Sequence, residues 1–265
     1  MKFILNRVEV SFSFENTPSR IISLVPSQTE LLYDLGLETS LVGITKFCMH
    51  PIHLKSKIKQ VGGTKNVNFE KIIALKPDII ICNKEENTLE MVEKLSTICP
   101  VLVTNIATIA DTLYMIDCFG KLFQQQKMAQ KWIDEINIAS EDFRSFISDF
   151  PIRKIVYLIW KNPYMVAGSG TFINEMLRIN NFKNIYGEQE RYPEIDPDKI
   201  TRNGVPDYIF LSSEPYPFKA KDLLEIEKFS GTAKIIFVDG ELFSWYGTRI
   251  LKAFEYFKNL HLKIL

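Results

Sequence analysis

The sequence has few cysteines, and their arrangement suggests neither a metal site nor a disulfide framework. Its 265 residues include four cysteines, at positions 48, 82, 99 and 118, with wide and irregular spacings and no Cys-x-x-Cys pair. Zinc knuckles and small disulfide-stabilised folds both need cysteines at short, regular spacings. The pattern therefore favours free thiols in a reducing compartment.

Net charge and long apolar runs are also absent. The 32 basic residues balance the 32 acidic ones, which argues against nucleic-acid binding because that function normally needs a basic face. No run approaches the roughly 20 apolar residues of a membrane-spanning helix. Residues 1–20 alternate apolar and polar side chains like an edge strand, without the apolar core of a signal peptide or an early cysteine for a lipid anchor. As written, the sequence predicts a cytoplasmic protein without membrane insertion.

Short apolar runs alternate with helical patterns through the first hundred residues. Residues 20–37 have the pattern of a strand, a turn at Pro26 and a helix that Ser27 and Glu30 open with the spacing of a capping box. Further strands are predicted near 40–45, 78–82 and 100–105, and helices over 68–76 and 87–98. This alternation predicts a mostly parallel sheet covered on both faces.

Residues 108–147 change to one long periodic pattern without proline, in which apolar residues recur at three- and four-residue steps. The pattern predicts one helix of roughly 30 residues or more, about 45 Å long. Beyond it the alternation of strands and helices resumes. We interpret the chain as an α/β protein of two Rossmann-like lobes, residues 1–107 and 148–265, joined by a backbone helix over 108–147, with a ligand cleft between the lobes.

A weak internal repeat supports two similar lobes. The segment NFEKIIALKPDIII aligns with DPDKITRNGVPDYIF, which places Glu70 over Asp198 and Asp78 over Asp207. The two pairs are separated by nearly equal lengths of chain. The repeat therefore supports two similar lobes with a cleft between them.

From about residue 20 to residue 260, the chain resembles the cobalamin and ferric-siderophore class of periplasmic substrate-binding proteins. The resemblance rests on the order and spacing of RIISLVPSQTELLYDLG, VGGTKNVNFEKIIALKPDIII, the long helix, NPYMVAGSGTFINEMLRINNFKNIY and VDGELFSWYGTRI. Within the class, it is most similar to cobalamin-binding proteins and to the helical backbone metal receptor group. The resemblance implies two α/β lobes on one rigid helix, a ligand held in the cleft and delivery of that ligand to an ABC importer.

The resemblance also implies a docking role for Glu70 and Asp198, because the class uses one carboxylate at the tip of each lobe to contact arginines of the permease. A simpler account is available from the sequence. Both acids lie in the predicted first turn of a helix, where carboxylates are favoured by unpaired N–H groups and the helix dipole by roughly 0.3–1 kcal/mol. A cytoplasmic protein would not meet the outer face of an importer, so location and docking role must be tested together.

Ligands of open α/β sheets bind beyond the carboxyl ends of the strands, which directs attention to the loops there. The predicted loops 45–51, 83–87, 160–165, 190–194, 212–218 and 240–247 are rich in aromatic residues. Such rings can stack on the flat face of a tetrapyrrole-like ligand, while polar side chains bond its amide fringe; the same rings can instead fill the cores beneath the loops. The predicted ligand contacts are Phe47, Cys48, His50, Glu85, Glu86, Trp160, Tyr164, Arg191, Tyr192, Glu214, Glu241, Phe243, Trp245, Tyr246 and Arg249.

The resemblance relates two positions of this sequence to the identity of the ligand. Tyr192 matches the position of a stacking tryptophan of the cobalamin binder, whereas Thr64 replaces the partner aromatic of the other lobe. Charged pairs on facing lobes can also hold the cleft shut without touching ligand, so this interpretation applies to the charged candidates Glu85, Glu86, Glu214, Glu241, Arg191 and Arg249.

Cys48 and His50, separated by one residue, allow three interpretations. A zinc site needs about four ligands, so His53 and acids such as Glu85 or Glu241 would have to complete it. A catalytic pair would need a third group that orients the base, and none is evident. Cys48 is expected to be a buried apolar group, whereas the neutral imidazole of His50 can ligate the cobalt of a corrinoid or another transition metal.

No nucleotide signature is present, because VGGTK and AGSGT lack the spacing of a phosphate-binding loop, although Gly168 to Thr171 opens a predicted helix and can bind an anion there. The sequence predicts a non-catalytic binding protein that needs no cofactor and takes a corrinoid or related metal chelate as its small-molecule ligand, with an ABC permease as a further partner. A direct transition-metal or ferric-siderophore binder, or an intracellular sensor or enzyme on the same scaffold, are the alternatives. If the family role holds, a periplasmic or extracellular location is expected instead of a cytoplasmic one.

Overall fold

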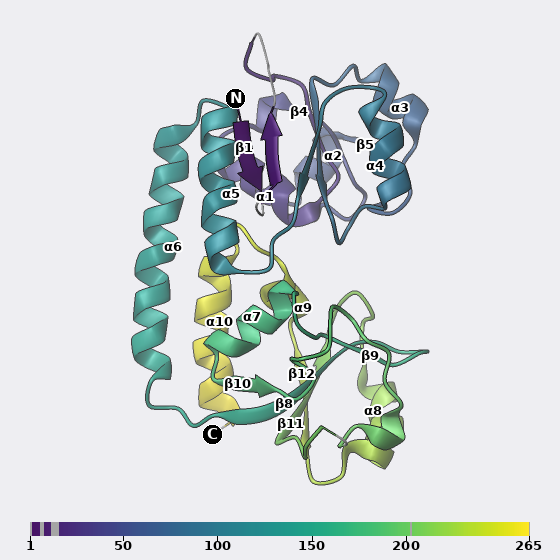
Figure 1. Cartoon of the computed structure of the whole chain (residues 1–265), viewed down its shortest axis with the longest axis vertical. Coiled ribbons are helices and arrows are strands. Elements are labelled where there is room, and N and C mark those ends of the chain that lie inside the picture. Colours follow the sequence, from purple (N-terminus) through teal and green to yellow (C-terminus); the bar gives the residue numbers. More distant parts are fainter. Residues whose placement is uncertain (1, 6–7, 12–15, 202, 265) are drawn as a thin grey trace. The chain divides into compact units, whose positions relative to one another are not determined.

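A computed structural model describes residues 2–5, 8–11, 16–201 and 203–264. The chain forms two compact units (Figure 1). The chain passes from the first unit to the second after Ile138, within a helix, and residues Tyr246–Arg249 return to the first unit before the last helix. Each unit contains a parallel sheet with helices, as the alternating sequence pattern predicts.

The sheet of the first unit has the strand order β5-β4-β3-β6-β7, and every neighbouring pair is parallel. Its strands are β3 (Ile21–Ser23), β4 (Leu41–Ile44), β5 (Lys59–Gln60), β6 (Ile79–Asn83) and β7 (Val101–Thr104). Its helices are α1 (Pro26–Asp34), η1 (Glu38–Ser40), α2 (Leu54–Lys57), α3 (Phe69–Ala74), α4 (Leu89–Ser96) and α5 (Ile109–Leu122). The N-terminal region, predicted as an edge strand, instead forms a separate antiparallel pair, β1 (Lys2–Leu5) and β2 (Val8–Ser11).

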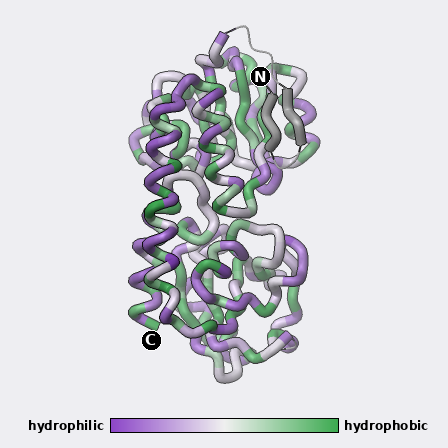
Figure 2. Tube along the Cα trace, turned by 60° about the vertical axis from the view of Figure 1, so that its left-hand side comes forward, coloured by the Kyte–Doolittle hydropathy of each residue, from purple (hydrophilic) through white to green (hydrophobic). Residues whose placement is uncertain are grey.

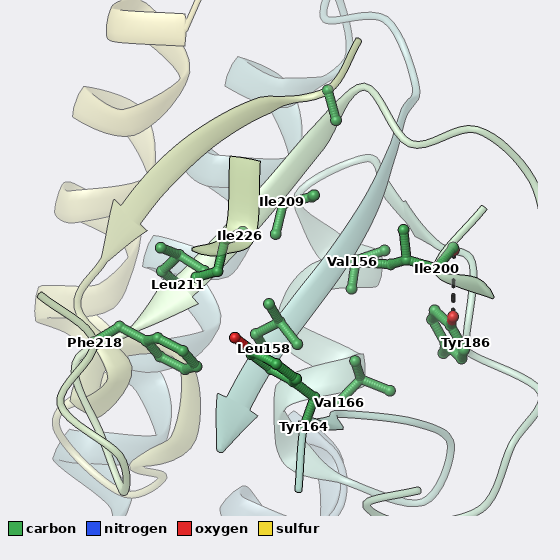
Figure 3. Packing of buried hydrophobic residues seen from close by; sticks show 11 residues of the cluster. Val156, Leu158, Tyr164, Val166, Tyr186, Ile200, Ile209, Leu211, Phe218 and Ile226 are labelled. Atoms are coloured by element: carbon green, nitrogen blue, oxygen red, sulfur yellow. Dashed lines mark hydrogen bonds between the residues drawn. The ribbon is translucent and has the colours of Figure 1, made fainter. Parts of the chain in front are cut away.

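The sheet of the second unit has the order β10-β8-β11-β12, again parallel, with β9 antiparallel to β8. Its strands are β8 (Arg153–Trp160), β9 (Met165–Val166), β10 (Phe182–Asn184), β11 (Tyr208–Ser212) and β12 (Lys234–Val238). Its helices are α7 (Phe172–Ile179), η2 (Pro197–Lys199), α8 (Ala220–Ser230), α9 (Gly240–Ser244) and α10 (Ile250–Ile264). Figure 3 shows one of its cores, where Val156, Leu158 and Leu211 of the sheet pack with Ile226 of α8.

The single helix predicted over 108–147 is wrong, because the region forms two helices, α5 and α6 (Gln126–Ile147). Gln124 has a φ of 56°, the left-handed conformation that commonly ends a helix, and the amide of Gln125 donates to the carbonyl of Gly120. A Cβ on Gly120 would lie 2.5 Å from that of Ala129, so the two helices pack side by side at this point. The sequence pattern missed the break because neither proline nor glycine marks it.

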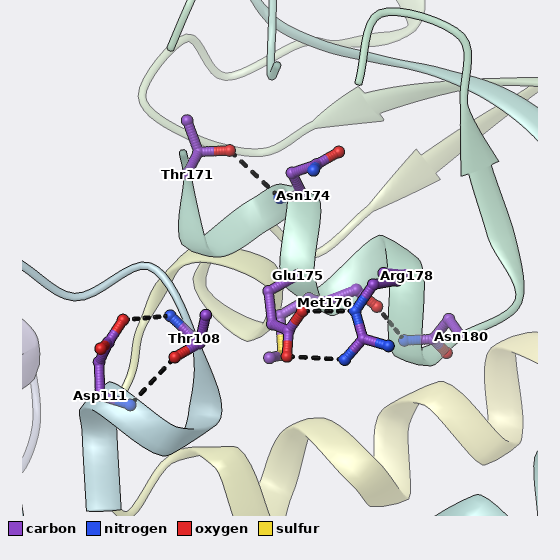
Figure 4. A network of polar contacts seen from close by, with 8 residues as sticks. All are labelled: Thr108, Asp111, Thr171, Asn174, Glu175, Met176, Arg178 and Asn180. Atoms are coloured by element: carbon purple, nitrogen blue, oxygen red, sulfur yellow. Dashed lines mark hydrogen bonds and ion pairs between the residues drawn. The ribbon is translucent and has the colours of Figure 1, made fainter. Parts of the chain in front are cut away.

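Two predicted helix starts also differ from the structure. The capping box of Ser27 and Glu30 does not form, because α1 already begins at Pro26, after Val25, and no side chain caps it. The helix predicted from Asp196 is the short 3-10 turn η2. Side-chain caps are present elsewhere: Thr108 and Asp111 form a capping box at α5, and Thr171 caps α7 by accepting from the amide of Asn174 (Figure 4).

The internal repeat corresponds to a repeated contact. Asp78, just before β6, accepts hydrogen bonds from the amides of Ser19 and Arg20 at the start of β3. In the second unit Asp207, just before β11, accepts from the amide of Lys154 in β8, at 2.7 Å. Each carboxylate therefore ties the start of one central strand to its neighbour, and the alignment of Asp78 with Asp207 is confirmed.

Hydrophilic and hydrophobic residues alternate along α6, as Figure 2 shows by colour. Among the residues that the structure describes, no helix combines the length and apolarity that crossing a bilayer requires.

His261 of α10 is a buried imidazole in the second unit. Its Nε2 lies 3.1 Å from Oδ1 of Asn180, and its ring stacks on Phe182 with a centroid separation of 4.7 Å. Burial lowers the pKa of His261 to about 4, whereas an unfolded histidine has a pKa of about 6.5. The unfolded chain therefore binds this proton more readily than the folded one, and stability falls as the pH drops from about 6.5 towards 4, by up to about 3 kcal/mol.

We expect His261→Gln to flatten this pH dependence, because glutamine can keep the hydrogen bond to Asn180 but does not titrate. The measurement is urea unfolding at pH 7 and pH 5, comparing the change in free energy of unfolding with that of the wild type. Equal pH slopes in the wild type and His261→Gln would contradict the assignment.

Candidate functional site

The strands of the first unit end in small polar residues that are buried. Ser23, Asn83 and Thr104 are the last residues of β3, β6 and β7, and Thr45 directly follows β4. All four side chains are almost completely buried. Because parallel strands have their carboxyl ends on one edge of a sheet, these four residues form a single row, here called the polar edge of the first unit.

Hydrogen bonds connect this polar edge. Asn83 Nδ2 donates to Thr104 Oγ1 at 3.1 Å, and the Thr104 hydroxyl donates to the carbonyl of Cys82. Gln28 Nε2 donates to Thr104 Oγ1 and, at 2.9 Å, to the Tyr246 hydroxyl. Buried polar groups persist only when they are bonded in this way, so the edge is a rigid, preorganised surface. Sequence reasoning missed Gln28 and Thr104; the signal was a polar residue directly after each apolar run.

Cys48 is completely buried beside this edge. Its Sγ lies 3.2 Å from Thr29 Oγ1 and 3.3 Å from Thr45 Oγ1. Burial raises the pKa of the Cys48 thiol, which keeps it protonated near neutral pH. The expected packing role of Cys48 fits this environment, and its predicted contact with ligand does not, because no part of the residue is exposed.

Other predicted contacts of the first unit lie on the loops that follow β4 and β6. Phe47 is 49% exposed, with Lys46 Nζ 5.0 Å from its ring centroid, and His50 is half-buried. Glu85 and Glu86 are half-buried, and the Glu85 amide donates to Asn83 Oδ1 at 2.7 Å. Burial, reinforced by the neighbouring charge of Glu85, raises the pKa of Glu86.

In the second unit, an aromatic pair follows the sheet at its carboxyl edge. Trp160, the last residue of β8, is 38% exposed, and its ring lies edge-on to Tyr216 at 5.9 Å. Next to it, Lys161 pairs with Asp222 at 2.9 Å and with Glu225 at 2.7 Å. These charges are engaged within the unit, whereas the indole of Trp160 presents an open face that a flat ligand can use.

Glu214, in the loop after β11, organises another predicted group. Its Oε1 accepts from Trp245 Nε1 at 2.9 Å and from Ser244 Oγ at 2.8 Å. Trp245 is buried, whereas Glu214 is half-buried. The structure therefore brings Glu214 and Trp245 together, as neighbours in one network.

Three predicted contacts have packing or pairing roles instead. Phe243 is 0% exposed and packs on Tyr157 and Phe257. Tyr164 lies in the core drawn in Figure 3, and its hydroxyl donates to Glu225 at 2.6 Å. Arg249 forms a bidentate, buried ion pair with Glu30 of α1, at 2.7 and 2.9 Å. Contacts inside the protein account for each of these three side chains, so their burial does not fit the ligand contacts that the sequence predicted for them.

The loop 190–194 was expected beyond a strand end, but it pairs with the segment before α7. The amide of Arg191 donates to the Ser169 carbonyl, and that of Gly168 donates to the Arg191 carbonyl. Arg191 and Tyr192 are half-buried there, as is Glu241 in the first turn of α9. A ligand-binding role of these three residues stays a prediction.

Glu70 and Asp198 are exposed, each in the first turn of its element. Asn68 caps α3 by accepting from the amide of Lys71, and Asp196 caps η2 by accepting from the amide of Asp198. A side-chain cap therefore already accepts from a backbone amide at the start of α3 and of η2, so neither Glu70 nor Asp198 is needed as a cap. Their equivalence in the repeat, each preceding the aspartate that ties two strands, is consistent with a shared role.

Within the ranges that the structure describes, no cluster of three or more His, Cys, Asp or Glu side chains could hold a metal ion. An open pocket of about 240 Å³ lies in the second unit around η2. Its lining residues are Tyr186, Gln189, Glu194, Ile195, Asp196, Lys199 and Asn203.

Comparisons with known proteins support one family. Residues 21–233 match a family described as periplasmic binding protein. An uncharacterized ABC transporter substrate-binding lipoprotein, YvrC of Bacillus subtilis, is 26% identical over 259 residues, covering 92% of this chain and 80% of the relative. The vitamin B12-binding protein of Pectobacterium atrosepticum is 24% identical over 245 residues, covering 89% and 86%. Among solved structures, the periplasmic vitamin B12 binding protein BtuF of Vibrio cholerae superposes with a TM-score of 0.79 at 21% identity, covering 94% and 98%.

The reactivity of the thiols tests whether any of the cysteines is an activated nucleophile. Burial raises the pKa of Cys82 to about 12 and that of Cys99, which is half-buried, to about 11. We expect native protein at pH 8 to react with Ellman's reagent at least about tenfold more slowly than free cysteine, because the reactive thiolate is scarce. Cys99 should react first, and Cys99→Ser should remove that phase.

Unfolding in guanidinium should make all four thiols react at once. A Cys48 that reacts in the native protein as fast as free cysteine would contradict this description and would indicate an activated nucleophile.

Proposed function

Because the chain belongs to the periplasmic binding protein family, we propose that it captures a small ligand without chemical turnover and delivers it to an ABC importer. The family match over most of the chain carries this proposal. The position of candidate ligand contacts at the strand ends of both sheets supports it. Several predicted contacts that are at least partly exposed lie at or just after the carboxyl ends of parallel strands, where ligands of α/β sheets bind: Phe47, His50, Glu85, Glu86, Trp160 and Glu214. That the ligand lies between the two units stays a prediction.

The ligand that we propose is a corrinoid or a related metal chelate. Vitamin B12-binding proteins are among the relatives. The side chains support a flat ligand with an amide fringe: the ring of Trp160 is 38% exposed, and the carboxyl groups of Glu85 and Glu86 can accept from amide N–H groups. Amide-bearing rings need hydrogen-bonding partners of this kind rather than strong opposite charges.

Binding without turnover fits the state of the one cysteine–histidine pair. A nucleophilic cysteine must reach the thiolate form, and the buried Cys48 is held as a thiol between two hydroxyls. We therefore propose that the pair helps shape the first unit's loop, with His50 as the side chain that can reach a chelated metal.

The delivery step would use Glu70 and Asp198. Both are exposed, neither is consumed by capping, and the repeat places them equivalently in the two units. Such acids can bind basic residues of a permease. We also propose a location outside the cytoplasmic membrane, since the family is described as periplasmic and one relative as a lipoprotein; cell fractionation tests it.

Calorimetric titration with cyanocobalamin and cobinamide tests the ligand. We expect binding by the wild type, and a Kd raised about tenfold or more in Trp160→Ala, equivalent to roughly 1.4 kcal/mol of lost stacking. Trp132→Phe is the matched control, because the Trp132 indole is bonded to the carbonyl of Asp34. It should leave the Kd unchanged.

No heat with any corrinoid would overturn the corrinoid assignment. In that case, titration with ferric hydroxamates and with haem, together with metal analysis of wild type and His50→Ala, tests the alternative of a siderophore or direct metal binder.

For the docking role, the change is Glu70→Arg combined with Asp198→Arg. We expect this variant to keep its ligand affinity but to stimulate its permease's ATPase in proteoliposomes at least about tenfold less, because like charges repel across the contact. Glu227→Arg, at another exposed helical acid, is the control. Equal stimulation by the double variant and the wild type would exclude the docking role.

A further inference from the structure

Lys161, which directly follows Trp160 at the end of β8, is held by two carboxylates of α8. Its Nζ lies 2.9 Å from Oδ1 of Asp222 and 2.7 Å from Oε2 of Glu225. The side chain of Lys161 is 12% exposed and that of Asp222 is 3% exposed, whereas that of Glu225 is 47% exposed. All three residues belong to the second unit, and we call them the charge cluster.

Hydrogen bonds fix both carboxylates of the charge cluster. Glu225 Oε1 accepts from the hydroxyl of Tyr164 at 2.6 Å, so each oxygen of this carboxylate has a donor. Asp222 Oδ1 also accepts from the Tyr216 hydroxyl, at 3.3 Å, and its Oδ2 accepts from the amide of Lys219 at 2.9 Å. A carboxylate held at both oxygens has a defined position, so its charge acts from a fixed place.

The three groups of the charge cluster are all ionised near neutral pH. The hydrogen bonds to Glu225 and Asp222 raise the pKa of Lys161, and the bond from Lys161 lowers the pKa of Glu225. Burial alone would raise the pKa of Asp222, but the hydrogen bonds from Lys161 and from the amide of Lys219 lower it overall. One positive and two negative charges are therefore present, and the ammonium of Lys161 is already engaged by carboxylates.

Tyr216 connects the charge cluster with the aromatic face of Trp160. The Tyr216 ring lies edge-on to the Trp160 indole at 5.9 Å, while its hydroxyl bonds Asp222. The carboxylate and the indole are thus separated by roughly one tyrosine side chain, a distance comparable to the Debye length of about 8 Å at physiological ionic strength. The excess negative charge of the cluster therefore acts on whatever contacts the indole.

Other charged side chains of this region are more open to solvent. Lys219 and Lys221, at the start of α8, and Glu227, further along the helix, are exposed. Solvent and salt screen such charges more strongly than the partly buried charges of the cluster. Glu214, half-buried in the same loop as Tyr216, adds a further carboxylate at this strand end.

We propose that the charge cluster makes the aromatic face of Trp160 selective for flat ligands whose nearest edge is neutral or cationic, and disfavours ligands that carry a carboxylate there. Asp222 and Glu225 act as specificity-determining residues through their charge, because repulsion of a competing ligand contributes to specificity as much as attraction of the right one. The preference for an amide-fringed ring over a carboxylate-bearing ring rests on the function proposed above. The negative charge beside Trp160 is independent of any ligand.

Quenching of Trp160 fluorescence in the ligand-free protein tests this charge. The contribution of Trp160 is the difference between the wild type and Trp160→Phe, and the quenchers are iodide, caesium and acrylamide at constant, low ionic strength. Glu225→Gln removes one negative charge, so we expect the quenching constant for iodide to rise about twofold and that for caesium to fall, with that for the neutral acrylamide unchanged. Glu227→Gln, with the same change at another exposed acid of α8, is the matched control and should leave all three constants unchanged.

Asp222→Asn is a second variant, because asparagine keeps an oxygen that can accept from the amide of Lys219. It should shift the iodide and caesium constants in the same directions as Glu225→Gln. Equal iodide constants in the wild type and in both variants would overturn the proposal.

The ligand preference is tested by titration with cyanocobalamin and with its isomeric monocarboxylic acids, in which hydrolysis converts one peripheral amide into a carboxylate. The wild type should bind at least one acid about threefold or more weakly than cyanocobalamin, and Glu225→Gln should reduce this difference. The same difference in the wild type and Glu225→Gln, or equal affinities of the wild type for all these ligands, would overturn the proposed selectivity. The expected quenching pattern without any corrinoid binding would support the charge beside Trp160 and overturn the corrinoid assignment alone.

Discussion

Parallel pairing of the strands is the constraint on which the rest of this structure depends. It brings every strand of a sheet to an end at the same edge, so side chains from loops far apart in sequence become neighbours. In the first unit the edge is lined by Ser23, Thr45, Asn83 and Thr104, which are buried and bonded. An apolar edge would need no such network. These buried groups hold the loops that follow the strands, because Thr45 Oγ1 accepts from the amide of Phe47 and Asn83 Oδ1 accepts from the amide of Glu85.

Burial also affects the titratable groups beside the polar edge. It raises the pKa of the Cys48 thiol and the pKa of the Glu86 carboxyl. Some charged side chains pair within a unit, as do Lys161 with Asp222 and Arg249 with Glu30. The partly exposed side chains at the strand ends, such as Trp160, fit the flat, hydrogen-bonding ligand that we propose.

The sequence predicted the α/β alternation and the repeat well, because apolar periodicity and the acids before central strands are local signals. Prediction from the sequence failed where tertiary contacts determine the local structure. Gln124 adopts a left-handed turn that splits the expected single helix, and no proline or glycine announces it. Phe243 and Tyr164 looked like pocket aromatics but fill cores, since composition does not reveal which face of a loop is covered. Gln28 was missed because its partners, Thr104 and Tyr246, come from distant segments.

The central claim is that the strand-end loops of both units contact the ligand. Hydrogen exchange with and without a saturating, independently identified ligand tests it most directly. The account predicts slower exchange in residues 45–53, 84–88, 161–164 and 213–219, which follow the carboxyl ends of β4, β6, β8 and β11, with little change in the loops at the opposite ends of the same strands. Protection confined to one unit, or concentrated at the amino ends of the strands, would contradict it.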